Sequence, residues 1–344
     1  MLALEIARPG VARVVERPDP SPGPGEVLLE VGFVGLCGTD LGTFAGKNPL
    51  VEYPRVIGHE VSGRVVDVGA GVERSWLGVQ AAVIPYKNCG ACPACRLGRP
   101  NACVRNQTLG VQRDGALAQW AAVPAVRLVP SARLPLDVLA LVEPFAIGMH
   151  AVVRAAVDAA DTVLVIGCGG VGAGAVAAAA ETGASVIALD LDPRKLEQAR
   201  RLGAAHLVDG RGDVPAQLQA ITSGEGPSVA IEAVGSPATY RLALDVVAAC
   251  GRVVCVGWLK GEVALEPRLV VLKEVTILGS RNATGELAAV VAMFESGRVD
   301  PRLVVTHRVP LDAAPAMLDR WAAAPQEVGK VLVSLGGASG GPLG

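Results

Sequence analysis

The chain contains 344 residues, of which 51% are hydrophobic, 19% charged and 3% aromatic. This apolar content excludes intrinsic disorder, and the length predicts about two domains, each with enough chain to bury its own core. The 31 Lys and Arg residues are balanced by 33 Asp and Glu residues. Because nucleic-acid binding depends on a basic field that this chain lacks, we expect no nucleic-acid partner.

Neither a membrane span nor an export signal is expected. The longest apolar stretch, VGAGAVAAAA from Val171, is about half of the roughly 20 residues that cross a bilayer. The first residues, MLALEIARPG, do not have the layout of a signal peptide. We therefore expect a cytoplasmic protein without a membrane partner.

Two patterns of apolar residues divide the chain. Up to about residue 142, short alternating runs are broken by Gly and Pro, which favours an antiparallel, barrel-like region over helices. Within it, residues 18–26 (PDPSPGPGE) are expected to form a surface loop before the first long strand. From about residue 161, strand-like runs alternate with Ala- and Leu-rich helical stretches, which indicates a parallel α/β sheet.

The expected strands of this sheet are short apolar runs at residues 162–167, 185–190, 228–234, 252–257 and 275–280. A helix is expected from residue 192 (DPRKLEQARRLG). After about residue 285 the pattern is less regular, and the last eight residues are expected to form a frayed tail.

A glycine-rich loop follows the first of these strands. Gly167, Gly169 and Gly172 have the G-x-G-x-x-G spacing and stand between a strand and a helix. In that context the first glycine permits a tight turn, the second lets the backbone approach a pyrophosphate, and the third lets helix and strand pack closely. The loop, with Gly170 and Val171, is therefore predicted to bind a dinucleotide at the helix N-terminus.

An acidic residue indicates which dinucleotide is bound. Asp190 ends the next strand, 18 residues after the last glycine of the loop. There a carboxylate can accept hydrogen bonds from ribose hydroxyls and would repel the extra phosphate of NADP, so NAD is favoured. Arg194 and Lys195 follow closely and leave NADP open. Val234 and Arg281 are further expected cofactor contacts.

Four of the eight cysteines lie within fifteen residues, at Cys89, Cys92, Cys95 and Cys103. Without an export signal, such a cluster favours thiolate metal ligands over disulfides. The segment has almost no large apolar residues to hold its shape, and four thiolates around one tetrahedral Zn(II) would supply that order. The spacing C-x2-C-x2-C-x7-C differs from that of ferredoxins. We predict a structural zinc; the alternative is a set of reduced surface thiols.

A second set of possible metal ligands is dispersed: Cys37 in GLCGTD, His59 and Glu60 in GHE, and Glu143 in VEP. Each of these residues alone is ordinary, because single Cys and His residues are common in cores and carboxylates are usually solvated. Together they form the mixed Cys, His and carboxylate set expected of a catalytic zinc with one open position.

Several motifs occur in one order along the chain: GLCGTD, GHEVSGRVVDVG, the four-cysteine loop, LVEPFAIGMHA and the glycine-rich loop. On these motifs the sequence resembles the zinc-dependent medium-chain alcohol dehydrogenases over nearly its whole length. The resemblance implies an α/β protein with a GroES-like β-barrel catalytic domain (1–146) and a Rossmann domain with a doubly wound parallel sheet (147–284). A C-terminal segment (285–344) would return to the catalytic domain, and the active site would lie in the cleft between the domains.

The same resemblance assigns roles to individual residues, with one catalytic and one structural zinc per chain. The catalytic zinc would be held by Cys37, His59 and Glu143. Glu60 would lie beside it as an occasional ligand, and Asp40 would orient the histidine ligand. Thr39 would hydrogen-bond the substrate alcohol. The resemblance also implies a homodimer or homotetramer assembled through the Rossmann domain, at the edge strand near Val275.

Two features bear on the substrate. Gly42 stands where many relatives have the histidine that ends a proton relay, so the last proton step would use water or another group. Glu143 within LVEP, and the short segment 37–60, resemble the polyol and sugar-acid branch, whose bacterial members oxidise a secondary hydroxyl of galactonate- or gulonate-like substrates. We therefore expect hydride transfer from a small-molecule polyol or sugar acid to NAD.

Other functions stay open. Within the family, the alternatives are a threonine 3-dehydrogenase and a general secondary-alcohol dehydrogenase; outside it, the alternative is a cofactor-binding protein without turnover. Arg113 and Arg281 are candidate partners of a substrate carboxylate, because Arg can bind one with two parallel hydrogen bonds. Arg113 could instead make a turn or interdomain contact, and Arg281 could touch the cofactor. Phe44, Trp120 and Trp258 are candidate pocket residues, although large rings usually serve packing.

Overall fold

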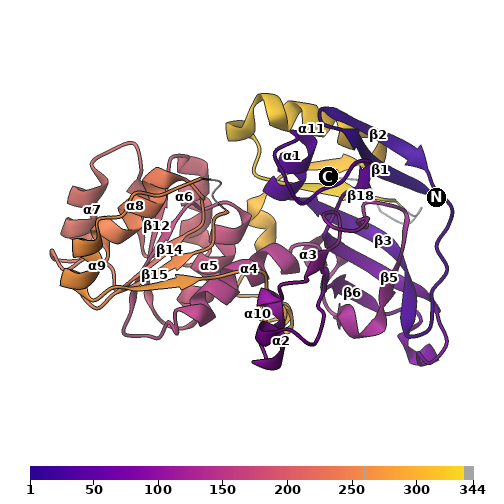
Figure 1. The fold of residues 1–344 in the computed structure, drawn as a ribbon, viewed down its shortest axis with the longest axis horizontal. Coiled ribbons are helices and arrows are strands. Elements are labelled where there is room, and N and C mark those ends of the chain that lie inside the picture. The colour runs from indigo at the N-terminus through magenta and orange to yellow at the C-terminus, as the bar shows by residue number, and fades with distance from the viewer. Residues whose placement is uncertain (259–260, 337–344) are drawn as a thin grey trace. The chain divides into compact units, whose positions relative to one another are not determined.

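The structure is a computed structural model that describes residues 1–258 and 261–336 (Figure 1). It divides into two compact units, of which the first joins Met1–Glu143 to the segment from Leu287 onward and the second is Pro144–Glu286. The expected frayed tail lies outside the described residues. None of the helices in the described ranges combines the length and the hydropathy that a bilayer span requires.

The first unit is built mainly from antiparallel strands. Its main sheet has the order β10-β6-β5-β3-β18-β17, with β9 also paired to β3. The 11-residue strand β3 (Glu26–Leu36) begins where the expected surface loop ends, and most of its first positions alternate between buried and less buried. This alternation places one face of the sheet on the apolar core.

The other strands of the first unit up to residue 143 are β1 (Leu2–Arg8), β2 (Val11–Glu16), β4 (Arg55–Val56), β5 (Glu60–Val68), β6 (Gln80–Val83), β7 (Tyr86–Lys87), β8 (Gln107–Thr108), β9 (Trp120–Pro124) and β10 (Leu128–Pro130). Its short helices in this part are α1 (Gly38–Phe44), α2 (Pro93–Arg96) and α3 (Leu136–Leu139). The prediction of a strand-rich region is therefore confirmed.

The chain after residue 285 is more regular than expected. It contains α10 (Glu286–Glu295), β17 (Val305–Pro310), α11 (Ala314–Ala323) and β18 (Lys330–Ser334). Strand β18 pairs antiparallel with β3 and parallel with β17, so it is an interior strand of the main sheet. The expectation of irregularity was wrong because β17 has no fully buried position and gives only a weak apolar pattern.

Six parallel strands form the sheet of the second unit, in the order β13-β12-β11-β14-β15-β16. The order reverses between β11 and β14, which is the doubly wound arrangement that the sequence predicts. Five strands begin within one residue of their expected starts: β11 (Thr162–Ile166), β12 (Ser185–Asp190), β14 (Val229–Glu232), β15 (Arg252–Cys255) and β16 (Thr276–Gly279). The sixth, β13 (His206–Asp209), was missed because only one of its four residues is fully buried.

Helices flank this sheet (Figure 1). They are α4 (Val142–Arg154), α5 (Gly170–Glu181), α6 (Pro193–Arg201), α7 (Val214–Ile221), α8 (Pro237–Val246) and α9 (Pro267–Lys273), and α6 is the helix expected from residue 192. The Asp192 side chain accepts a hydrogen bond from the Arg194 backbone N–H and so caps α6.

Candidate metal and cofactor sites

The four cysteines of the local cluster converge. Their sulfur atoms all lie within 4.8 Å of one another, and none of the chain's eight cysteines is in a disulfide. The backbone N–H of Cys89 donates to Cys103 Sγ at 3.3 Å. The backbone N–H of Ala91 donates to the Cys89 sulfur and is the main cause that lowers its pKa to about 5, so the loop stabilises a thiolate. Four sulfur donors in this arrangement fit a tetrahedral Zn(II) that leaves no position for substrate.

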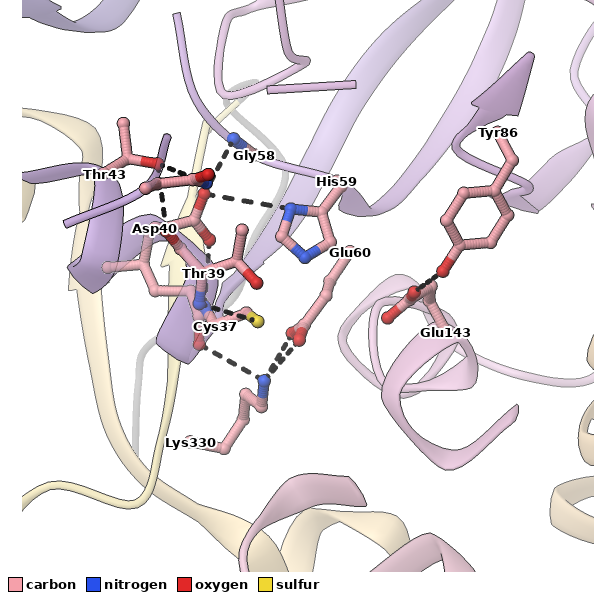
Figure 2. Close-up of polar contacts among 12 residues, drawn as sticks. Cys37, Thr39, Asp40, Thr43, Gly58, His59, Glu60, Tyr86, Glu143 and Lys330 are labelled. Carbon is pink, nitrogen blue, oxygen red and sulfur yellow. Dashed lines mark hydrogen bonds and ion pairs between the residues drawn. The ribbon is translucent and has the colours of Figure 1, made fainter. Parts of the chain in front are cut away.

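Helix α1 fixes three residues of the dispersed set (Figure 2). Cys37 is its N-cap residue, and Cys37 Sγ accepts a hydrogen bond from the Thr39 backbone N–H at 3.3 Å. In return, the Asp40 carboxylate accepts from the Cys37 backbone N–H at 2.9 Å. This reciprocal capping satisfies N–H groups that a helix start otherwise leaves unpaired. The helix start therefore sets the position of Cys37, Thr39 and Asp40 together.

His59 comes directly before β5, after a turn that requires glycine. Gly58 has a φ of +100°, and a Cβ atom there would come within 2.9 Å of a neighbouring backbone nitrogen. The buried His59 Nδ1 lies 3.8 Å from Asp40 Oδ1 and has no hydrogen-bond partner in the described part of the chain. This distance exceeds that of a hydrogen bond. The other ring nitrogen points toward Cys37 and Glu60 (Figure 2).

Cys37, His59 and Glu60 form a compact donor group. One sulfur, one nitrogen and one carboxylate oxygen from these residues lie within 4.8 Å of one another. Burial alone would lower the pKa of His59, yet the neighbouring Asp40 and Cys37 raise it well above its usual value. A buried site in which acidic groups surround an imidazole attracts a cation. The donor set and its charge therefore fit zinc.

Glu60 also contacts a residue that sequence analysis missed. Lys330 is the first residue of β18, and its buried Nζ lies 2.5 and 2.6 Å from the two Glu60 carboxylate oxygens. The same Nζ donates to the Leu36 carbonyl at 3.2 Å. Burial would lower the pKa of Lys330, but Glu60 and its neighbours raise it, so the amine is charged. No pattern in the sequence connects two residues that are 270 positions apart.

Glu143 stands apart from this donor group. It lies in the first turn of α4, is buried, and accepts a hydrogen bond from the Tyr86 hydroxyl (Figure 2). Burial raises the pKa of the Glu143 carboxyl, and burial beside Glu143 raises the pKa of Tyr86 well above its usual value. The hydroxyl therefore keeps its proton and donates it in the hydrogen bond. Tyr86 was not singled out in the sequence, where a lone Tyr before the cysteine loop is no signal.

The aromatic residues considered for a substrate pocket lie in different environments. Phe44 is 5% exposed and belongs to the apolar core of the first unit, so packing accounts for it. Trp120 begins β9 and is partly buried. Trp258 is 70% exposed.

The two candidate arginines also differ. Arg113 is partly buried, and its Nη2 donates to the Pro85 carbonyl at 3.4 Å, a contact within the first unit between residues 28 positions apart. Arg281 is exposed and follows β16.

A Cβ atom at Gly42 would meet nothing within 4 Å, so the position of the missing relay histidine is open.

The glycine-rich loop has the geometry that its spacing predicts. Gly167 follows β11 with a φ of +89°, and a Cβ atom at Gly172 would come 1.7 Å from the Gly167 carbonyl oxygen. This contact allows only hydrogen at Gly172 and lets α5 pack on the turn. Gly169 is the N-cap residue of α5, and a Cβ atom there would meet open space. The first turn of α5 contains the remaining loop residues Gly170 and Val171.

Asp190 lies beside this loop. Its two carboxylate oxygens accept hydrogen bonds from the backbone N–H groups of Cys168 at 2.7 Å and Asp192 at 2.9 Å. Arg194 is paired with Asp192, with Nη2 2.8 Å from Oδ2. Val234 follows β14 and is 51% exposed. The glycine-rich loop, Asp190 and Val234 thus lie at the carboxyl ends of β11, β12 and β14, where doubly wound sheets bind ligands, whereas Arg281 follows β16.

Family models match both units of the chain. The model described as alcohol dehydrogenase GroES-like domain matches residues 23–134, and the model described as zinc-binding dehydrogenase matches residues 170–296. L-galactonate-5-dehydrogenase of Escherichia coli (strain K12) is 38% identical over 297 residues, which are 86% of this chain and 87% of that protein. The chain is a zinc-dependent medium-chain dehydrogenase. The predicted GroES-like domain and Rossmann sheet, and the resemblance to the polyol and sugar-acid branch, are thereby confirmed.

Solved structures of dehydrogenases have the same fold. A protein from E. coli CFT073 described as a short chain alcohol dehydrogenase, complexed with NADH, has a TM-score of 0.91 and 28% identity, covering 97% of this chain and 99% of that one. A zinc-binding dehydrogenase from Sinorhizobium meliloti 1021, bound to NADP, has a TM-score of 0.90 and 31% identity, covering 97% of this chain and 98% of that one. The expected enzyme class, a zinc-dependent dehydrogenase with a nicotinamide cofactor, is thus confirmed.

Proposed function

We propose that this dehydrogenase oxidises a secondary hydroxyl of a polyol or sugar acid, with NAD as the hydride acceptor. The observation that carries the proposal is the convergence of Cys37, His59 and Glu60 in one donor group of the first unit, with the buried carboxyl of Glu143 outside that group. The identity shared with L-galactonate-5-dehydrogenase supports a sugar-acid substrate over a simple alcohol.

Bound zinc would polarise the substrate oxygen as a Lewis acid, and bound NAD would accept the hydride. Cys37, His59 and Glu143 would hold this zinc, because Lys330 engages both oxygens of Glu60. The four-cysteine loop would hold a second zinc with a structural role.

Thr39 and Asp40 would serve the reaction from α1. Thr39 is exposed beside Cys37, so its hydroxyl can hydrogen-bond a substrate hydroxyl and pass the proton on. Asp40 is buried next to His59 and would orient the imidazole and raise its basicity. Because Gly42 leaves an open position, water would take the proton at the end of this path.

Asp190 would select NAD by accepting hydrogen bonds from the adenosine ribose. Its carboxylate is fixed by two backbone N–H groups, and Arg194, the nearby cation that could accept a 2′-phosphate, is engaged by Asp192. Asp190→Ser should lower the ratio of kcat/KM for NAD to kcat/KM for NADP by about tenfold or more. This fold-change corresponds to the loss of roughly one charge-assisted hydrogen bond. An unchanged ratio would remove Asp190 as the selecting residue.

A homo-oligomer is proposed on the basis of the second unit. β16 is an edge strand of its sheet, and Ile277 on that strand is 43% exposed. An unpaired edge with exposed apolar side chains favours pairing with a second copy. Ile277→Lys should reduce the molar mass in light scattering from that of a dimer or tetramer; a wild-type monomer would contradict the proposal.

The direct test measures NADH formation at 340 nm with zinc-loaded protein, NAD and a panel of hexonates, pentitols, hexitols, threonine and short secondary alcohols. We expect activity with a sugar acid or polyol, and its loss in Cys37→Ala. Activity with threonine or small alcohols alone would keep the chemistry and overturn the substrate class. Silence across the panel, with the same zinc content in wild type and Cys37→Ala, would favour a cofactor-binding protein without turnover.

A further inference from the structure

The Glu60–Lys330 pair is unusually buried. The side chains are 1% and 6% exposed, and Lys330 is the most buried Lys or Arg among the ion pairs of the described ranges. Removing two charges from water is costly unless the geometry of the pair is close and other hydrogen bonds satisfy it. Lys330 meets this condition with two short contacts to Glu60 and a third to the Leu36 carbonyl.

Three adjacent strands bring the pair together. Strand β3 lies between β5 and β18, with Gly35 opposite Glu60 and Leu36 opposite Val331. A Cβ atom at Gly35 would come 2.0 Å from Glu60 Oε2. The absence of a side chain at Gly35 therefore opens the path along which Glu60 reaches Lys330 across the middle strand.

The two carboxylates near Cys37 and His59 are held differently. Glu60 has a cation on both oxygens, whereas Glu143 has one neutral donor, the Tyr86 hydroxyl. A Zn(II) ion bound by one thiolate, one carboxylate and a neutral imidazole has no net charge, and the Glu60–Lys330 pair is also neutral. Without Lys330, the buried charge of Glu60 would have the metal as its remaining cation.

We infer that Lys330 is a positioning residue that holds Glu60 off the catalytic metal and thereby sets how readily this site releases zinc. The inference rests on the proposed metal site in the first unit. It assigns a function to the C-terminal strand β18: the strand supplies the cation that keeps the nearby carboxylate from becoming an additional ligand.

The test compares metal release from four full-length zinc-loaded proteins: wild type, Lys330→Met, Glu60→Gln and the double variant. The release of zinc to a chromophoric chelator is followed over time. The phase that is missing in Cys103→Ser is assigned to the four-cysteine loop, and the other phase to the catalytic site. We expect Lys330→Met to slow release from the catalytic site about tenfold, because Glu60 becomes a ligand. Glu60→Gln and the double variant should both release metal at about the wild-type rate.

A second readout reports the coordination directly. In protein with Co(II) at the catalytic site, Lys330→Met should weaken the visible d–d bands, as expected when a four-coordinate ion gains a fifth ligand, and the double variant should recover them. Lys330→Arg retains the positive charge and can donate two parallel hydrogen bonds to the Glu60 carboxylate, so it should resemble wild type in both readouts. It also keeps the test decisive if Lys330→Met does not fold.

Equal release from wild type and Lys330→Met, or equally slow release from Lys330→Met and the double variant, would overturn the inference. If Lys330→Met does not fold, metal release or Co(II) bands of Lys330→Arg that differ from wild type would overturn it as well. Failure of the proposed metal site is distinguishable, because wild type and Cys37→Ala would then hold the same amount of zinc, all of it lost in Cys103→Ser.

Discussion

The first unit contains two candidate metal sites that are built in opposite ways. The four-cysteine loop takes all its donors from one segment of fifteen residues. The dispersed site takes Cys37 from the start of α1, His59 from the turn before β5 and Glu143 from α4, and the Glu60–Lys330 pair beside it joins β5 to β18. The comparison teaches that a local site needs only spacing, whereas a dispersed site needs the finished sheet.

The two sites also differ in what surrounds them. Around the loop, backbone N–H groups of the segment itself donate to the sulfur atoms of Cys89 and Cys103. In the dispersed site, buried carboxylates need buried partners, and Tyr86 and Lys330 supply them. We therefore expect changes in the loop to affect folding first, and changes in the dispersed site to affect chemistry first.

The largest expected effect is on folding. Cys103 is fully buried and contacts Cys89, so Cys103→Ser should remove the structural zinc and the order that it provides. The zinc content should fall from about two ions per chain to about one, and Tm by about 10 °C or more, since structural zinc supplies much of the folding energy of such loops. Metal analysis and thermal unfolding provide the measurements. An unchanged Tm after zinc loss would show that the loop does not contribute to folding.

The second largest effect should be a loss of catalytic activity in a protein that still folds. His59→Asn should lower kcat/KM by about a thousandfold or more, because the Lewis acid that stabilises charge in the transition state is lost. The loop should keep its zinc, and Tm should change by only a few degrees. Steady-state rates, metal analysis and thermal unfolding on the same preparation check this prediction. A fall in Tm as large as that of Cys103→Ser would show that the dispersed site contributes to folding as much as the four-cysteine loop does.

A smaller effect should come from the donor of Glu143. Tyr86→Phe leaves that buried carboxylate without its hydroxyl partner, so zinc affinity of the dispersed site should fall about tenfold, the lower end of the range for groups that support metal ligands. Competition with a chelator measures the affinity. Tyr240→Phe is the matched control, because the Tyr240 hydroxyl donates to the Gly257 carbonyl in the second unit. Equal zinc affinities of Tyr86→Phe and Tyr240→Phe would show that Glu143 does not bind the metal.

The smallest effect concerns a clamp outside both sites. The Asp137 carboxylate on α3 lies 2.9 Å from Arg302 Nε and 2.8 Å from Arg308 Nη2. Burial would raise the pKa of Asp137, but the two guanidinium groups lower it. Because the folded pKa is depressed, the stabilisation is present above the ordinary value of 3.8 and is lost as the pH falls through the lower folded value.

Asp137→Asn should therefore reduce the unfolding free energy by about 1 kcal/mol at pH 7, a modest amount because both arginines are partly exposed. The difference from wild type should shrink as the pH falls below 3.8. Urea unfolding at pH 7 and pH 3 measures both values, and zinc content at pH 7 should stay unchanged. A difference that persists in acid would assign the effect to packing instead of charge.

The sequence predicts the second unit better than the first. Its strands are nearly continuous apolar runs because both faces of the sheet are covered, and the glycine spacing identifies β11 and α5 directly. The edge strand β13 has a single fully buried residue and gives no such run. In the first unit, the weak pattern of β17 concealed the regular C-terminal segment.

The donor residues were predicted, but not their partners. Cys37, His59 and the carboxylates stand in recognisable motifs, and three of them converge. Lys330 and Tyr86 act through long-range contacts, with separations of 270 and 57 residues, that depend on strand order and register. A single Lys or Tyr has no spacing pattern, so its role emerges only from the packed structure.

The position of β18 has a consequence for biosynthesis. The strand lies between β3 and β17, yet it is synthesised only after the entire second unit, Pro144–Glu286, has been made. Until then, the C-terminal part of β3, residues 33–36, lacks its partner on one side, because β9 pairs only with residues 26–30. Unpaired strand edges promote association with other chains. The first unit thus begins folding early but completes its sheet late, so part of its sheet edge stays open to association while the second unit is being translated.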